Sequence, residues 1–191
     1  MAESTVNCNE IALPVDRSSD KIGPLRRGTI TPYDRLVLAT GSSPFVPPIA
    51  GLRTSDQTLR PGAFVFRTLG DCERIVACAR ESRRVAVIGG GLLGLEAARG
   101  LLDAGLEVHV VHVMNRLMDL QLDDASAHIL RRQLERAGLH VLLGKTTERV
   151  LGDGAVTGLQ FDDGSSLPCD MLVLATGVRP NVALARDAGL V

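Results

Sequence analysis

The chain of 191 residues has no tryptophan, one tyrosine and four phenylalanines. A platform for nucleic acids usually stacks bases on aromatic side chains beside clustered basic residues, so this scarcity and the scattered Lys and Arg disfavour one. No stretch approaches the ~20 apolar residues that a membrane helix needs, and the acidic, polar start is not a signal peptide. We therefore expect neither nucleic acid nor a membrane as a partner.

Cysteine is also scarce, and its spacing argues against several kinds of chemistry. The four cysteines include no Cys-x-x-Cys pair. Cys72 and Cys78 would face about 240° apart on one helix, so a redox disulfide is not expected. His109 and His112 stand at odd spacing on a strand and point to opposite faces, so they cannot bind one metal ion together. The sequence predicts no metal site, and it calls for no catalytic triad or paired carboxylates.

The remaining composition is that of an ordinary folded domain. Hydrophobic residues make up 45% and charged residues 23%, with a net charge of −1. Such a chain is neither disordered nor a binder of polyanions, and its length could bury about 70% of the unfolded surface. We expect a soluble, cytoplasmic α/β protein.

A glycine motif between an apolar run and an Ala/Leu-rich helical pattern is the most informative segment. In Gly-x-Gly-x-x-Gly, Gly89 permits a tight turn, Gly91 lets the backbone approach a pyrophosphate, and Gly94 allows helix and strand to pack closely. The phosphates would lie at the helix N-terminus, whose free N–H groups and dipole favour anions. The alternative is a glycine-rich turn without a ligand. The predicted site comprises Gly89, Gly90, Gly91, Leu92, Leu93 and Gly94.

The end of the next strand leaves the choice of cofactor open. An NAD site usually has Asp or Glu there to accept a hydrogen bond from the ribose, but this chain has His112, followed by Arg116. A neutral His112 could bond the ribose, whereas Arg116 could bind a 2′-phosphate. Each is otherwise a surface residue.

Two segments are almost copies of each other. Residues 33–44 read YDRLVLATGSSP, and residues 169–180 read CDMLVLATGVRP. Each is predicted as a buried parallel strand that stops at a small-residue turn. The glycine turn belonging to the first copy would fall before residue 1. We infer that the polypeptide begins inside a nucleotide-binding domain whose upstream part is missing or supplied by another chain.

Two Ala-Thr-Gly strands flanking one Gly-Gly-Gly-x-x-Gly resemble the flavoprotein reductases with two dinucleotide-binding domains, the pyridine nucleotide-disulfide oxidoreductase superfamily. The resemblance covers roughly residues 25–191. Within it, residues 110–118 (VVHVMNRLM) and the following Gln-Leu-Asp at 121–123 resemble the flavin domain of the large subunit of NAD(P)H-dependent nitrite reductase.

The resemblance implies roles for particular residues. Glu96 would lie near the nicotinamide, or else complement the helix dipole as a first-turn carboxylate. Thr176 and Gly177 match the closing turn of the NAD(P) domain. A turn that touches FAD matches Thr40, Gly41 and Ser42. In the intact family enzyme, hydride passes from the nicotinamide to flavin N5. An FAD site at Gly89 itself is disfavoured, because a flavin site would keep an acidic residue where His112 stands.

The predicted fold class is α/β: a Rossmann-like parallel sheet with an antiparallel β-meander insertion, preceded by a remnant of an FAD-binding domain. We expect an irregular segment over residues 1–24, the remnant and crossover over 25–83, and the NAD(P) domain over 84–191. The remnant would contain strands near 27–30 and 35–39 and a helix capped by Asp71.

The predicted function is the NAD(P)H-binding core of an FAD-dependent oxidoreductase, as the electron-input module of a nitrite reductase. Both ends of the flavin domain and any siroheme or iron–sulfur cysteine cluster are lacking, so missing flavin-domain segments or a redox protein would be partners. The alternatives are a truncated nucleotide-binding module without catalysis and a fragment of a ferredoxin or rubredoxin reductase.

Overall fold

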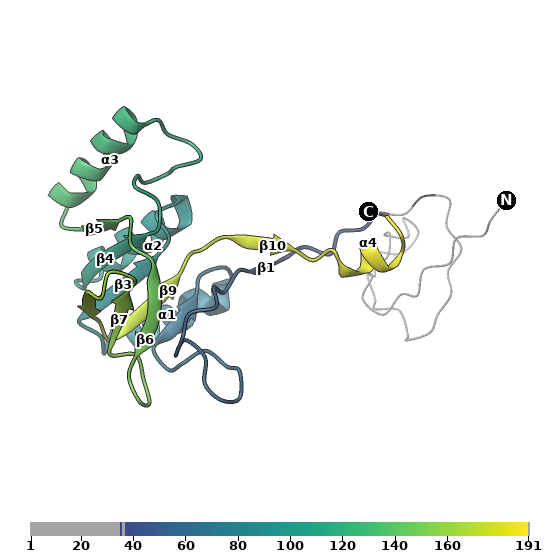
Figure 1. Ribbon diagram of the computed structural model, residues 1–191, viewed down its shortest axis with the longest axis horizontal. Helices are drawn as coiled ribbons and strands as arrows, with labels where there is room; N and C mark the ends of the chain where they lie inside the picture. The colour runs from purple at the N-terminus through teal and green to yellow at the C-terminus, as the bar shows by residue number, and fades with distance from the viewer. Residues whose placement is uncertain (1–34, 36, 191) are drawn as a thin grey trace. The chain divides into compact units, whose positions relative to one another are not determined.

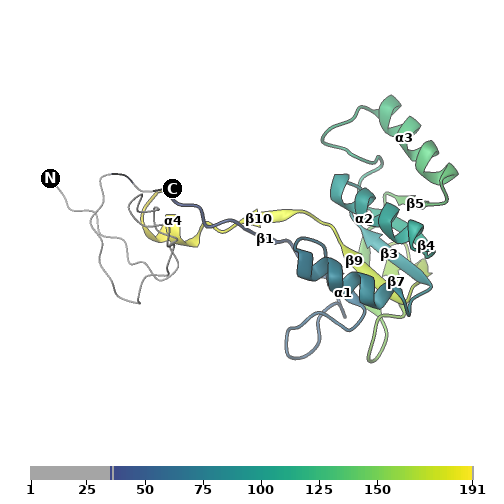
Figure 2. The same ribbon diagram turned by 180° about the vertical axis from the view of Figure 1, so that it is seen from behind.

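The computed structural model of the chain describes residues 35 and 37–190. The chain divides into two compact units, one of residues 44–177 and the other of residues 1–43 and 178–191. Figures 1 and 2 draw the larger unit from its two sides. None of the helices in the described part of the chain is both long and apolar enough to cross a bilayer.

The centre of the larger unit is a parallel sheet with the strand order β2-β9-β3-β4-β5. These strands are β2 (Ala63–Val65), β3 (Arg84–Ile88), β4 (Glu107–His112), β5 (His140–Leu143) and β9 (Met171–Leu174). The inner strands are rich in Val, Leu and Ile, and Val87 and Val110 are fully buried. Apolar residues on both faces are typical of a parallel sheet that is covered on both sides.

Helices cover one face of this sheet. They are α1 (Leu69–Ala79), α2 (Leu92–Asp103) and α3 (Asp124–Arg136). Contacts join α1 to β2 and β9, α2 to β3 and β4, and α3 to β5. Ile75 of α1 and Ala98 of α2 pack against Val87 in one core cluster. Because β2 and α1 share this core, residues 63–79 belong to the same packed unit as residues after 84; the predicted domain boundaries stay predictions.

The cap of α1 differs from the prediction. Asp71 is not the N-cap but the third helical residue, and Thr68 is the N-cap. The Thr68 hydroxyl accepts from the Asp71 N–H at 3.2 Å, and the Asp71 carboxylate accepts from the Thr68 N–H at 2.8 Å. This reciprocal capping box satisfies two N–H groups at once, and it starts the helix three residues earlier than a lone Asp cap would.

The predicted antiparallel meander is present, and it covers the other face of the sheet (Figure 1). Its strands are β6 (Thr147–Leu151), β7 (Gly158–Phe161) and β8 (Ser166–Pro168). Leu159 and Phe161 of β7 pack against Ala86 and Leu172 in a second core cluster. Helices, parallel sheet and meander therefore form three layers, and the predicted α/β Rossmann-like fold is confirmed.

The smaller unit overturns one prediction. Among its described residues it contains β10 (Val178–Pro180), which pairs with β1 (Ser42–Pro44), and α4 (Ala183–Asp187). The strand predicted over residues 35–39 is wrong: residues 35 and 37–40 form no strand, and Val37 is 80% exposed. β9, the corresponding strand of the second sequence copy, pairs with β2 and β3, whereas no described strand pairs with residues 37–39. The strand predicted near 27–30 lies outside the described residues.

Candidate functional site

A cavity of about 560 Å³ lies at the carboxyl ends of the central strands. The glycine turn after β3, the end of β4 and the turn after β9 form its floor, as expected of ligand sites in open α/β sheets. All of its lining residues belong to the larger unit. The sequence-predicted residues that line it are Gly89, Gly90, Gly91, Leu92, Leu93, His112, Thr176 and Gly177.

The fold itself requires glycine at two positions of the turn. Gly89 has a φ of +125°, and a Cβ there would lie 2.3 Å from the Ala175 carbonyl oxygen. A Cβ at Gly94 would lie 2.0 Å from the Gly89 carbonyl oxygen. Real Cβ atoms do not approach backbone so closely, so these glycines allow α2 to pack against the ends of β3 and β9.

Gly91 is different, because the fold does not need a glycine there. It is the N-cap of α2 with a φ of −85°, which any residue can adopt, and a Cβ would meet nothing within 4 Å. Having no side chain, Gly91 leaves the first N–H groups of α2 without a side-chain cap. Such uncapped N–H groups at a helix N-terminus bind anions, and phosphate above all. The open space above Gly91 therefore fits a phosphate group.

His112 is held by the protein through both ring nitrogens. Its Nδ1 accepts a hydrogen bond from the Gly90 N–H at 3.2 Å, and its Nε2 lies 3.1 Å from Asp119 Oδ1. A neutral ring with its hydrogen on Nε2 satisfies both bonds. The ring also lies over Gly90, where a Cβ would come within 2.8 Å of it. His112 thus supports the glycine turn, and its contact with a ribose stays a prediction.

Arg116 does not line the cavity, because other groups hold its guanidinium. Its Nη1 lies 2.7 Å from Asp124 Oδ1, and its Nη2 donates to the Asp119 carbonyl oxygen at 3.1 Å. Reaching a 2′-phosphate would require Arg116 to leave Asp124. That role stays a prediction.

Glu96 lies in a second cavity, of about 380 Å³, between α1 and α2. Phe66 and Cys72 line this cavity with it, and most of its other lining residues are apolar. Glu96 is not among the residues that line the first cavity, and its predicted place near the nicotinamide stays a prediction.

The predicted FAD turn belongs to the smaller unit and is described by itself. The Thr40 hydroxyl donates to the Asn181 carbonyl oxygen at 2.5 Å, and the Gly41 carbonyl accepts from the Asn181 N–H at 2.9 Å. Neighbouring Ser42 begins β1. These bonds explain how the turn is fixed, while the contact of Thr40, Gly41 and Ser42 with FAD stays a prediction.

The closing turn after β9 is tied to a wall that the sequence did not reveal. The Thr176 hydroxyl donates to the Phe45 carbonyl oxygen at 2.6 Å, and the Phe45 N–H donates to the Gly177 carbonyl oxygen at 2.9 Å. Phe45, Pro47 and Ile49 line the cavity. The prolines in this segment predicted only an irregular crossover. No local sequence pattern indicates that the segment contacts the end of β9.

The loop between β5 and β6 supplies the polar rim, which the sequence also did not reveal. Lys145 is the one Lys or Arg among the lining residues, and its Nζ contacts Asp163 and the Ser165 hydroxyl. Hydrogen bonds from Lys145 and Ser165 hold the pKa of the Asp163 carboxyl well below its usual range. Thr147 also lines the cavity, and its hydroxyl is buried without a partner. A bound ligand could supply that partner.

The sheet, its glycine turn and the cavity at the carboxyl ends of the strands define a Rossmann-type domain of the class that binds dinucleotides. The family model described as pyridine nucleotide-disulphide oxidoreductase matches residues 5–191. The chain belongs to this family of oxidoreductases.

The similar curated proteins include nitrite reductases. The chain is 43% identical to nitrite reductase [NAD(P)H] of Bacillus subtilis over 95% of the chain and 22% of the relative. It is 48% identical to the nitrite reductase [NAD(P)H] large subunit of Klebsiella oxytoca over 85% of the chain and 16% of the relative. The chain therefore spans about a fifth of the length of these relatives.

Solved structures show the same fold. An NAD-dependent persulfide reductase from A. fulgidus is 31% identical with a TM-score of 0.78, covering 94% of this chain and 32% of that one. A ferredoxin reductase from Rhodopseudomonas palustris is 32% identical with a TM-score of 0.77, covering 85% of this chain and 39% of that one.

Proposed function

We propose that this chain is the NAD(P)H-binding part of an FAD-dependent oxidoreductase that passes hydride from NAD(P)H to flavin. The observation that carries the proposal is the open space above Gly91. The fold does not require glycine at this position, and the space lies at the uncapped N-terminus of α2. Membership of the oxidoreductase family supports it, as does the similarity to a nitrite reductase [NAD(P)H] and to an NADH oxidase.

The residues of the cavity suggest how a dinucleotide would lie. We assign the pyrophosphate to the N–H groups of residues 91–94, because an anion there meets the positive end of the α2 dipole. The adenosine would lie toward His112 at the end of β4, and the nicotinamide toward Thr176 at the end of β9. Lys145 at the rim adds a positive charge for a phosphate group. The buried Thr147 hydroxyl offers the dinucleotide a further polar contact.

The protein's contribution would be placement and electrostatics. When bound, NAD(P)H supplies the hydride and FAD accepts it. The apolar wall of Phe45, Pro47 and Ile49 would keep water from the nicotinamide end, while the hydrogen bond from Thr176 to Phe45 fixes that wall to β9. The turn at Thr40 to Ser42 is the part that we assign to the flavin.

A narrower proposal is that the chain is the electron-input module of a nitrite reductase. The identities of 43% and 48% to two nitrite reductases support it. The chain spans only a small part of those relatives, so the remainder of a longer polypeptide or a separate redox protein would receive the electrons. A cytoplasmic location, which the composition favours, belongs to the same proposal.

Nucleotide titration tests the proposal. Isothermal titration with NADH and with NADPH should show binding that Gly91→Val weakens at least tenfold, because the new side chain fills the space for the pyrophosphate. Gly100→Ala is the matched control: it adds a Cβ to the same helix where nothing lies within 4 Å, away from the turn. The affinity of Gly100→Ala for NADH and for NADPH should equal that of the wild type. Absence of binding by the wild type, or equal binding by Gly91→Val, would refute the assignment.

A second measurement addresses hydride transfer. With FAD and an artificial electron acceptor added, the wild type should oxidise NADH, and Gly91→Val should not. Binding without oxidation under these conditions would instead identify a nucleotide-binding module that lacks catalysis.

A further inference from the structure

Three metal-binding side chains meet at the amino ends of β4 and β5, the end of the sheet opposite the nucleotide cavity. Glu107 and His109 are two residues apart on β4, so they point to the same face. His140 begins β5 and is the register partner of His109 on the neighbouring parallel strand. The sequence predicts no metal site, because His109 and His112 lie on opposite faces of β4. Spacing along the chain does not reveal a partner from the next strand.

The contacts within this cluster are close. His109 Nε2 lies 2.8 Å from Glu107 Oε1, and the rings of His109 and His140 stack with centroids 4.5 Å apart and an interplanar angle of 16°. One ligand atom from each of the three residues lies within 4.8 Å of the others. A tetrahedral zinc ion with bonds of about 2.0–2.1 Å needs its ligand atoms about 3.4 Å apart. Reaching that spacing would require the exposed His140 side chain to rotate.

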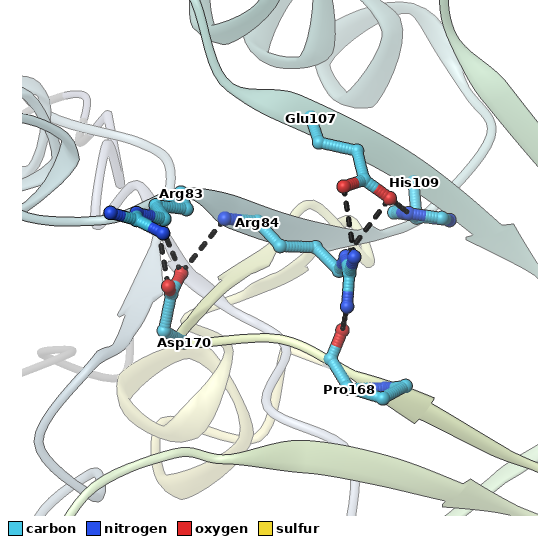
Figure 3. Close-up of polar contacts among 6 residues, drawn as sticks. All are labelled: Arg83, Arg84, Glu107, His109, Pro168 and Asp170. Carbon is cyan, nitrogen blue, oxygen red and sulfur yellow. Dashed lines mark hydrogen bonds and ion pairs between the residues drawn. The ribbon is translucent and has the colours of Figure 1, made fainter.

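Arg84 fixes the carboxylate from the outer side. Figure 3 shows its guanidinium against Glu107, with Nη2 2.9 Å from Oε2 and Nε 2.9 Å from Oε1. Its Nη1 reaches the Pro168 carbonyl oxygen at 3.4 Å, which ties the arrangement to β8. Such outer contacts orient metal ligands in proteins. A hollow of about 550 Å³, lined by His109, His140 and Leu167, gives an ion access from solvent.

We propose that Glu107, His109 and His140 bind one divalent transition-metal ion of the zinc class, with the remaining coordination position open to water. Two imidazoles and one carboxylate are ligands that zinc and cobalt accept, whereas magnesium prefers oxygen ligands. The ion would join β4 to β5 at the edge of the sheet. It would be independent of the nucleotide, which we assign to the opposite ends of these strands.

Cobalt is the probe, because tetrahedral Co²⁺ absorbs visible light and reports its ligands. Titration of the full chain with Co²⁺ should give d–d bands that saturate at one ion per chain, without the thiolate-to-cobalt charge-transfer band that cysteine ligands produce. Zn²⁺ should displace the cobalt, and Mg²⁺ should not. Absence of these bands, or a charge-transfer band that carries the whole signal, would overturn the proposal.

Variants locate the ion. His140→Ala and Glu107→Gln should each weaken Co²⁺ binding at least tenfold, whereas His128→Ala, an exposed histidine on α3 outside the cluster, should leave it unchanged. Glu107→Gln is the milder change and keeps the shape of the side chain. NADH affinity, measured on the same samples, should be unaffected and serves as the check of folding. Cobalt binding that survives both substitutions, or that falls equally in His128→Ala, would place the ion elsewhere.

Discussion

Substitution of Gly94 or Gly91 by alanine distinguishes a glycine that the fold requires from a glycine that a bound ligand requires. At Gly94 the new Cβ would lie 2.0 Å from the Gly89 carbonyl oxygen and 3.0 Å from its carbon. Both are backbone atoms that cannot move without opening the turn. Overpacking typically costs about 1–3 kcal/mol, and we expect Gly94→Ala to lose about 3 kcal/mol.

At Gly91 the same methyl group meets no atom within 4 Å, and the φ of −85° suits alanine. Alanine is a poorer N-cap than glycine, so the free energy of unfolding should fall by less than about 1 kcal/mol. The methyl group would nevertheless stand where we place the pyrophosphate. Displacing one charge-assisted hydrogen bond costs about 1.5–3 kcal/mol, which corresponds to at least a tenfold loss of NADH affinity.

Urea denaturation and NADH titration of both variants measure these effects. Gly94→Ala should be clearly destabilised, and Gly91→Ala should be folded but bind NADH weakly. If Gly94→Ala unfolds at the wild-type urea concentration, the described turn is wrong. If Gly91→Ala binds NADH as tightly as the wild type, the reasoning about the pyrophosphate fails.

Three further substitutions test other contacts. His112→Ala removes the acceptor of the Gly90 N–H and should lower the free energy of unfolding by about 1–3 kcal/mol in urea; an unchanged midpoint would mean that this bond is unimportant. Asp163→Asn should destabilise the protein at pH 7 because Lys145 loses its partner. Since the folded pKa of this carboxyl is lowered, the difference should shrink progressively as pH falls below about 4, which denaturation at several pH values would detect. Thr68→Val removes the cap of α1 and should cost about 1 kcal/mol in thermal denaturation, whereas a Tm equal to that of the wild type would contradict the capping box.

The parallel sheet could be predicted because its strands are apolar on both faces and the glycine turn marks where β3 ends. The same apolar pattern failed at residues 35–39, because a strand also needs neighbours and no described strand pairs with this segment. The short β2 went unrecognised, since three residues after a Pro-Gly pair carry no period. A local apolar pattern therefore predicts a strand correctly only where neighbouring strands are present to pair with it.

The site shows the same division. The residues of the glycine turn and of the strand ends come together because the carboxyl ends of parallel strands converge on one edge of the sheet. Phe45, Asp119 and Lys145 come from loops, and nothing in the sequence indicates that these loops return to the cavity. The pairing of His109 with His140 depends on the register of neighbouring strands, which lies beyond any local motif.

The most direct test of the central claim is to follow the backbone amides of the full chain by NMR while NADH is added. We predict that the largest shifts fall on Gly91, Leu92 and Leu93, with smaller ones at Thr176. Shifts that are absent from these amides at saturating NADH, or that gather on another surface, would contradict it.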